Sequence, residues 1–311
     1  VASQLVSDTQ AEPFIATTRE DYEQVRIARA GKTGKKLTTL EEARANAAVV
    51  DMSLKATAPA KPGLHVYEDW DLAELRDYID WTPFFRAWEL AGNYPAILTD
   101  KIVGESATDL FRDAQVMLDQ IIEEKWLTAK GVAGIWRARR EGDDILVSPE
   151  NAGHGIDEHV QRFEMDKDDY NSILLKALAD RFAEAFAERM HEHVRKDLWG
   201  YAADENLNNK DLIREKYQGI RPAPGYPACP DHSLKPILFE MLDATANTGI
   251  ELTSGFAMTP TAAVSGFYFA HPQADYFGVA RISEDQVEEY ATRRGVSVEQ
   301  AQRWLRPNLN E

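Results

Sequence analysis

The stretch LLKALADRFAEAFAERMHEHVRKDL, residues 174–198, organises the rest of the chain. Large apolar side chains recur there at every fourth position: Leu174, Leu178, Phe182, Phe186, Met190, Val194 and Leu198. Side chains four residues apart lie on one face of an α-helix. The pattern therefore predicts a helix over 168–198 with a buried stripe about seven turns long. Glu184 falls off this stripe, so the pattern by itself predicts a solvent-exposed carboxylate there.

A second informative stretch, RPAPGYPACPDH at 221–232, contains four of the chain's 14 prolines and its only cysteine. Proline fixes φ and lacks a backbone N–H, so this run is neither a helix interior nor a central strand. Gly225 can adopt a positive φ or let a ligand approach the backbone. We expect a stiff, extended loop with Arg221 at its head. Two roles remain open for it: a binding loop for a small polar ligand, or a rigid connector between elements.

Composition limits the class of protein. The chain has 311 residues, enough for one large domain or two small ones, and a formal net charge of −17 that argues against nucleic acid or an anionic membrane as a partner. No apolar run is long enough to span a membrane, and the start of the chain has no signal-peptide pattern. The single cysteine excludes an internal disulfide and suits a reducing, cytoplasmic compartment. Because the chain begins Val-Ala-Ser-Gln without Met, we expect a fragment of a longer protein or a processed product.

Helix and strand patterns run along the whole chain without the strand–helix alternation that is typical of parallel sheets. They predict an α+β fold with a mainly antiparallel central sheet flanked by helices. The other predicted helices are 1–30, a short one after Thr39, 71–80, one starting at Pro83, 105–126, 233–249 and two within 283–305. The predicted strands are a hairpin in 131–148 that turns at 141–144, and several strands within 250–282. Three residue pairs have the spacing of a capping box: Thr39 with Glu42, Ser283 with Gln286, and Ser297 with Gln300.

Asp80 lies next to the aromatic residues Trp81, Phe84 and Phe85. A carboxylate beside so much apolar surface must be paired or exposed. Two roles remain open from the sequence. Asp80 is either the N-cap of the helix that starts at Pro83, or an acceptor for the ammonium group of a ligand.

Two other constellations have the residue types of a catalytic or metal site but not the spacing. Cys229, Asp231 and His232 lie within four residues, whereas thiol hydrolases usually bring the base from elsewhere in the fold. We therefore expect Cys229 to be a small packing residue. His191 and His193 are two residues apart and point to different faces of a helix, so we expect no metal site there.

The loop RPAPGYPACPDH, with YQGI just before it, resembles the signature of the activation domain of cobalamin-dependent methionine synthase. Three further segments carry the same resemblance in order along the chain: DYIDWTPFFRAWELAGNYPAIL (77–98), KALADRFAEAFAERMHEHVRKDLWGYA (176–202) and SGFYFAHPQADYFGVARISEDQVEEYA (265–291). The resemblance implies an elongated, C-shaped domain at 63–311, preceded by a helical arm and linker at 1–62.

This chain departs from the family around 149–167, where the resemblance implies further strand and helix segments. We expect a shortened region here that is disordered or a loose surface excursion, because the sequence PENAGHG offers little apolar surface to anchor it. A natural short variant, an engineered deletion and an incomplete sequence remain open as reasons.

The resemblance implies S-adenosylmethionine as the ligand. Arg221 suits its carboxylate, Asp80 suits its ammonium group or another polar edge, and Tyr276 can present an aromatic face or a hydroxyl. Glu184 and Glu215 would supply negative charge or hold Arg221. The expected ligand-binding residues are Asp80, Glu184, Glu215, Arg221, Ala223, Gly225, Tyr226, Tyr276 and Phe277; the family commonly has tyrosine at the position of Phe277. We expect no catalytic or metal-binding residue.

For function, the resemblance implies the C-terminal reactivation module of the enzyme. Its ligand would donate a methyl group to inactive cobalamin bound by another module of the same enzyme, with an electron from flavodoxin or a flavoprotein reductase. The chain would bind the methyl donor in the cytoplasm but would not turn over methionine by itself. The alternative is a non-catalytic docking module for a flavodoxin-type redox partner, without ligand binding.

Overall fold

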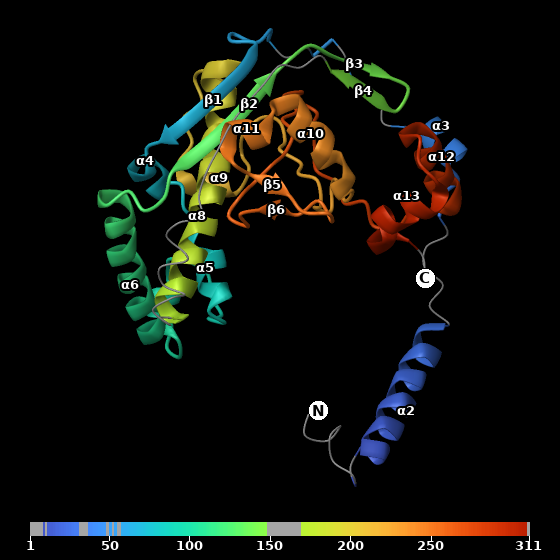
Figure 1. Ribbon diagram of the computed structural model, residues 1–311, viewed down its shortest axis with the longest axis horizontal. Helices are drawn as coiled ribbons and strands as arrows, with labels where there is room; N and C mark the ends of the chain where they lie inside the picture. The colour runs from blue at the N-terminus through green and yellow to red at the C-terminus, as the bar shows by residue number, and fades with distance from the viewer. Residues whose placement is uncertain are drawn as a thin grey trace.

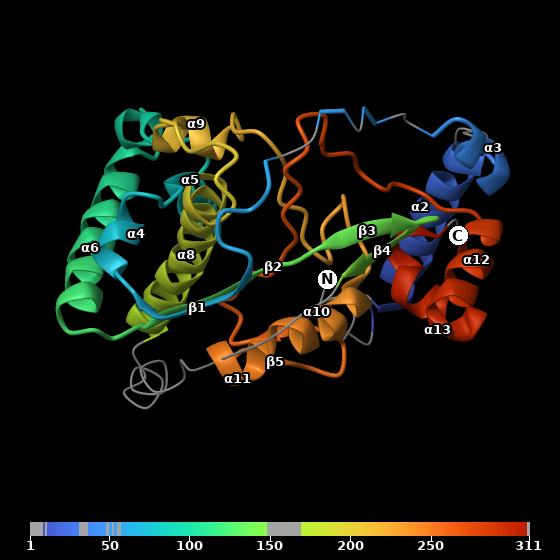
Figure 2. The same ribbon diagram turned by 90° about the horizontal axis from the view of Figure 1, so that it is seen from above.

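The helix predicted from the stripe is the centre of the structure. It runs as α8 (Asp169–His193) and continues into one π-helical turn, Val194–Leu198. Each of the seven stripe residues is at most 9% exposed, so the predicted stripe is confirmed as buried. In Figures 1 and 2, α8 lies between α6 (Gly104–Glu123) and the paired strands β1 (Gly63–Trp70) and β2 (Ala129–Ile135).

The structure is a computed structural model that describes Thr9 and residues 11–30, 37–47, 50–51, 53–54, 57–147 and 169–309. The region predicted to be shortened, 149–167, lies outside these residues. The remaining helical elements are α2 (Ala11–Ala30), α3 (Leu40–Ala45), α4 (Leu72–Arg76), α5 (Trp81–Ala87), η1 (Ala96–Thr99), α9 (Asn209–Ile213), η3 (His232–Leu234), α10 (Lys235–Leu242), α11 (Ala244–Thr248), α12 (Glu284–Arg294), α13 (Val298–Leu305) and η4 (Arg306–Asn308). Across the described ranges, none of the helices combines the length and the apolar character that a membrane crossing requires.

The core forms where α4, α5 and α6 pack against the stripe. Leu75, Phe84, Phe85, Leu118 and Ile121 are each at most 1% exposed in this cluster. The helix predicted at 71–80 is shorter than expected: α4 ends at Arg76. The next helix, α5, begins at Trp81, two residues before the predicted start at Pro83. The predicted helix at 105–126 is confirmed as α6.

The strands of the described residues form three two-stranded antiparallel sheets, so the α+β class with antiparallel pairing is confirmed. β3 (Ala138–Glu141) and β4 (Asp144–Val147) are joined by a turn at the predicted place. The hairpin predicted over 131–148 is nevertheless too long. β2 pairs with β1 instead, and the strand β1 was not predicted.

Packing on α8 explains why β2 leaves that hairpin. A Cβ added at Gly131 would lie 2.8 Å from the Phe186 ring, so the glycine allows β2 to approach the stripe closely. β1 lacks a regular period-two pattern, because Glu68 and Asp69 are adjacent polar residues and the register with β2 shifts between Tyr67 and Trp70.

The second half of the chain contains less regular structure than predicted. The helix predicted at 233–249 is divided by Asp243, whose φ is +40°, and it ends at Gly249 with φ +80°. Of the strands predicted in 250–282, β5 (Glu251–Leu252) and β6 (Met258–Thr259) form a ladder. In the rest of 250–282, Phe269 forms an isolated antiparallel bridge with Ile220. Pro222 explains why this bridge does not become a ladder, because proline has no N–H to donate.

The three predicted caps are present. Thr39 and Glu42 form a capping box at the start of α3. The backbone N–H of Ser283 donates to the Gln286 side chain at α12, and Ser297 caps α13 by accepting from the backbone N–H of Gln300. In Figure 1, α12 and α13 form one end of the elongated body, and the α6–α8 core forms the other.

A polar cluster is buried on another face of the α8 region. Arg195 is fully buried and donates to Glu205 at 2.9 and 2.6 Å, with its guanidinium 4.0 Å from the centre of the Tyr217 ring. His191 is also fully buried and stacks on Tyr268, with 4.9 Å between the centres of the two rings. Neither ring nitrogen of His191 has a hydrogen-bond partner in the described structure. Burial, followed by the charges of Arg195 and Arg221, lowers the pKa of His191 to about 2.

The stripe can be tested by truncating one of its members. Leu178→Ala should lower the free energy of unfolding by about 2–5 kcal/mol, because it removes fully buried methyl groups and leaves a cavity. Ile173→Ala on the same helix is the control, because Ile173 is 54% exposed and its truncation should change stability by no more than about 0.5 kcal/mol. Urea unfolding measures both; equal losses would contradict the assignment of the core face.

His191 should make stability depend on pH. Its pKa is depressed in the folded state, so on acidification the unfolded state takes up the proton first. The stabilisation is therefore complete above the ordinary pKa of about 6.5 and is lost at about 1.4 kcal/mol per pH unit below it. His191→Gln should remove this slope. Urea unfolding from pH 7.5 to 4.5 compares the two proteins, and the difference between the curves isolates His191 because the carboxylates titrate in both. Parallel curves would show that His191 does not titrate in this way.

Candidate functional site

The proline loop has the stiff, irregular conformation that its sequence predicts. Gly225 has φ +101°, and its N–H donates to the Cys229 carbonyl at 2.7 Å. The Cys229 N–H in turn donates to the Tyr226 carbonyl at 2.8 Å, which closes a tight turn. A Cβ at Gly225 would lie 2.1 Å from the His232 ring, so only glycine fits where the turn packs on that ring.

The loop is held against the extended segment that follows β6. Phe267 donates its N–H to the Pro222 carbonyl at 2.9 Å, and Val279 donates to the Pro227 carbonyl at 2.7 Å. These bonds bring the region around Tyr276 next to the loop, although the two stretches are about fifty residues apart in the sequence.

Arg221 connects this loop to α8. Its Nη2 donates to Oε2 of Glu188 at 3.2 Å, and its Nη1 donates to the Ala187 carbonyl at 3.2 Å. The side chains of Arg221 and Glu188 are 18% and 12% exposed. Burial alone would lower the pKa of Arg221, but the Glu188 carboxylate, Tyr217 and Tyr268 together outweigh burial and keep that pKa above its usual range. The guanidinium therefore remains a fixed positive charge beside α8.

Tyr276 holds the backbone of the same residue. The Arg221 N–H donates to the Tyr276 hydroxyl oxygen at 2.7 Å. Burial raises the pKa of Glu215, and the charge of Arg221 and the Tyr276 hydroxyl oppose this rise. Tyr276 lies in irregular backbone, and the structure brings it together with Arg221 and Glu215. Burial raises the pKa of Tyr276, so its hydroxyl stays protonated at neutral pH.

Most of the other predicted site residues are exposed. Glu184 is exposed, as its position off the stripe predicts. The pKa of Tyr226 is raised by the partial burial of its own side chain and, to a smaller extent, by the negative charge of Glu184. Tyr226 and Phe277 are 58% and 74% exposed. Ala223 lies in the turn, where its carbonyl accepts from the Tyr226 N–H at 3.1 Å.

Asp80 has the structural role that the sequence left open. Its carboxylate accepts from the Thr82 N–H at 2.9 Å and caps α5. This bond joins Asp80 to Thr82 and does not connect Asp80 with Arg221, Glu188 or Tyr276. A role for Asp80 toward a ligand remains a prediction.

Glu188, the carboxylate that pairs with Arg221, was not predicted from the sequence. Glu188 lies one turn after Glu184 on the same face of α8, so the four-residue spacing could have indicated it. Its burial could not be predicted, because that depends on the loop folding over this turn of the helix.

The Cys229 region does not have the geometry of a thiol hydrolase. The Asp231 carboxylate accepts from the Ser233 N–H and hydroxyl, each at 2.7 Å, and His232 is hydrogen-bonded to Lys235 at 2.8 Å. Burial raises the pKa of Cys229, which disfavours a thiolate. Asp231 and His232 are thus bonded to other partners, and the packing role of Cys229 remains a prediction. The described residues contain no group of three or more His, Cys, Asp or Glu side chains that could hold a metal ion.

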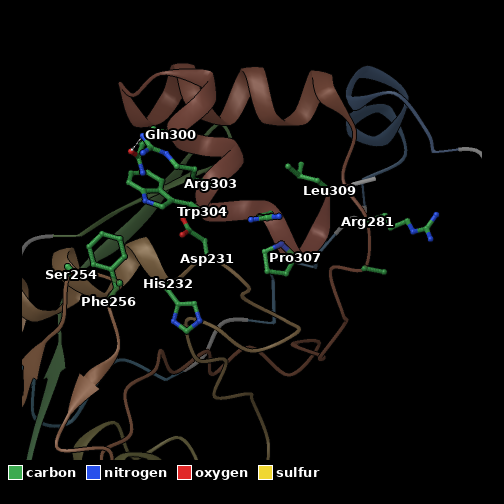
Figure 3. A pocket seen from close by; sticks show the side chains of 13 residues that line it. Asp231, His232, Ser254, Phe256, Arg281, Gln300, Arg303, Trp304, Pro307 and Leu309 are labelled. Atoms are coloured by element: carbon green, nitrogen blue, oxygen red, sulfur yellow. Dashed lines mark hydrogen bonds between the residues drawn. The ribbon is translucent and has the colours of Figure 1, made fainter. Parts of the chain in front are cut away.

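Two hollows lie near the loop. Arg221 and Pro222 line the larger one, of about 1560 Å³, together with Phe186 and Gly266. The other, about 1310 Å³, lies between α13 and the turn that joins β5 to β6 (Figure 3). Its arginines do not converge on one point: Arg303 donates to Gln300, and the Arg281 side chain points away from Trp304. The hollow beside Arg221 therefore has the better placed positive charge for the carboxylate of a ligand.

Known proteins match this chain in sequence and in fold. The family model for the activation domain of vitamin B12 dependent methionine synthase matches residues 71–152 and 149–295. A solved structure, the reactivation domain of MetH bound to AdoHcy, aligns with a TM-score of 0.82 and 45% sequence identity. The alignment covers 88% of this chain and 99% of that chain. The chain therefore belongs to the family of activation domains of vitamin B12 dependent methionine synthase.

Proposed function

We propose that this chain is the reactivation module of a cobalamin-dependent methionine synthase, and that it binds S-adenosylmethionine. The observation that carries the proposal is the 45% identical neighbour, which holds AdoHcy and aligns over 99% of its length. AdoHcy is S-adenosylmethionine without the transferable methyl group. The module would extend over 63–311, with 1–62 as an arm and linker.

The residues around Arg221 fit such a ligand. The guanidinium can bind an α-carboxylate through two parallel hydrogen bonds, and it already lies at the edge of a hollow. Carboxylates of Glu184 and Glu215 provide negative potential for the ammonium and sulfonium groups. Ala223 and Gly225 place backbone atoms within reach of the ligand, and Tyr226, Tyr276 and Phe277 offer aromatic surface.

In this proposal the protein contributes orientation, since the sulfonium is itself a good leaving group. S-adenosylmethionine supplies the methyl group, and the cobalamin that receives it is bound by another module of the enzyme. The residues of this chain hold the amino-acid end of the donor and exclude water from it. A flavodoxin or flavoprotein reductase is the proposed electron source, and the cytoplasm is the proposed location. The isolated chain should bind the donor without producing methionine.

Arg221 provides the decisive test. Arg221→Ala should weaken S-adenosylmethionine binding by roughly thirtyfold or more, because losing a buried charge-assisted pair costs about 2–5 kcal/mol. Arg221→Lys should recover only part of this loss, since an ammonium group lacks the planar fork. Cys229→Ser is the control and should stay within about threefold of the wild type. Isothermal titration measures all four proteins. If the wild type gives no saturable isotherm, a docking module without ligand becomes the better assignment.

Asp80→Asn separates the two roles of Asp80. Asparagine is as good an N-cap as aspartate, so the melting temperature should stay close to that of the wild type. If the carboxylate also contacts the ligand, affinity should fall about tenfold or more, because a hydrogen bond to a charged group contributes about 1.5–3 kcal/mol. Unchanged affinity in the same titration would leave Asp80 with the cap alone.

A further inference from the structure

The pairing of Glu188 with Arg221 has a consequence for binding. Both side chains are largely buried, yet only one carboxylate oxygen of Glu188 is used: Oε2 pairs with Arg221, and Oε1 has no hydrogen-bond partner among the described residues. A buried carboxylate oxygen without a partner is unfavourable for stability, and such groups in native proteins call for another explanation. Glu188 is therefore a poor choice if stability of α8 were its only role.

We propose that Glu188 is a positioning residue: it orients the Arg221 guanidinium for the carboxylate of the ligand without contacting the ligand. This inference rests on the proposed function. Three groups from two parts of the chain fix Arg221: Glu188 and the Ala187 carbonyl on α8 hold the side chain, and Tyr276 holds the backbone N–H. A guanidinium held in this way loses little conformational entropy when it binds.

Glu188 is not a competitor for the ligand. It accepts a single hydrogen bond, and Ala187 accepts another, so the described contacts use two of the five N–H groups of a guanidinium. The remaining donors are sufficient for a carboxylate that binds through two parallel bonds. Competition would instead predict a bidentate pair between Glu188 and Arg221, like the one that Arg195 makes with Glu205.

The charge of Glu188 also keeps the Arg221 guanidinium in place. Removing the carboxylate would leave the Arg221 guanidinium beside α8 with only the Ala187 carbonyl from that helix. A buried cation without its counter-charge moves toward water, so the Arg221 guanidinium would no longer be held in the orientation that suits the ligand carboxylate. Removing the Glu188 carboxylate should therefore weaken the interaction with the ligand carboxylate and leave the interactions with the rest of the ligand unchanged.

The experiment compares two ligands, S-adenosylmethionine and decarboxylated S-adenosylmethionine, which lacks the α-carboxylate. Isothermal titration uses the wild type, Glu188→Gln and Glu188→Ala. Both variants should bind S-adenosylmethionine about tenfold more weakly, and their affinity for the decarboxylated ligand should stay within about threefold of the wild type. Glu192→Gln is the matched control: Glu192 is another buried carboxylate of α8, but it bonds Tyr78 and Lys196 rather than Arg221. This control should change neither affinity.

Three results would contradict the inference: equal weakening for both ligands, unchanged binding of both, or tighter binding of S-adenosylmethionine. Equal weakening would mean a general structural role, and tighter binding would mean that Glu188 competes with the ligand. If the wild type binds neither ligand, the proposed function fails, and side-chain ¹⁵N NMR of Arg221 then decides the positioning role alone. That role predicts a slowly rotating guanidinium in the wild type and a freely rotating one in Glu188→Gln; equal rotation in the two would overturn it.

Discussion

The structure depends on α8, because one face of this helix forms the hydrophobic core and another face binds Arg221. One face carries the stripe of Leu and Phe side chains on which α4, α5, α6 and the β1–β2 pair assemble. Another presents Glu188 and the Ala187 carbonyl to Arg221. The helix that forms the core is thus the same rigid element that fixes the charged centre of the site. A site on such an element is held more accurately than one made from loops alone.

The proline loop contributes what a regular element cannot. Pro222 can accept a hydrogen bond from Phe267 but has no N–H to return one, so pairing with the neighbouring segment stops after the bridge at Ile220. The chain on both sides remains extended and irregular. This keeps backbone groups and the Arg221 side chain at the edge of a hollow, where a ladder would have used them.

Several of the buried polar atoms without hydrogen-bond partners lie near Arg221. They include Glu188 Oε1, both ring nitrogens of His191, the Tyr217 hydroxyl and the Ser265 hydroxyl, within the contacts that the structure describes. A region selected only for stability would satisfy such groups or replace them with apolar side chains. Their position beside Arg221 agrees with a region where binding, and not stability alone, has set the residue types.

The sequence by itself determined the elements whose cause is local. The period-four stripe fixed α8, the spacing of Ser or Thr with Glu or Gln fixed the caps of α3, α12 and α13, and the prolines fixed the irregular loop at 221–232. These follow from periodicity and backbone chemistry, which need no knowledge of distant residues. The resemblance of long motifs similarly indicated Arg221, Tyr276 and Glu215 as members of one site.

Only the tertiary structure decided which distant segments meet. β2 left its predicted hairpin to pair with β1, because Gly131 lets it pack on Phe186, and the strands expected after β6 remained extended because their neighbour is a proline loop. Glu184 and Glu188 are equivalent in the pattern of α8, yet the loop covers Glu188 and leaves Glu184 in solvent. Burial and pairing are properties of two surfaces brought together, and a linear pattern describes only one of them.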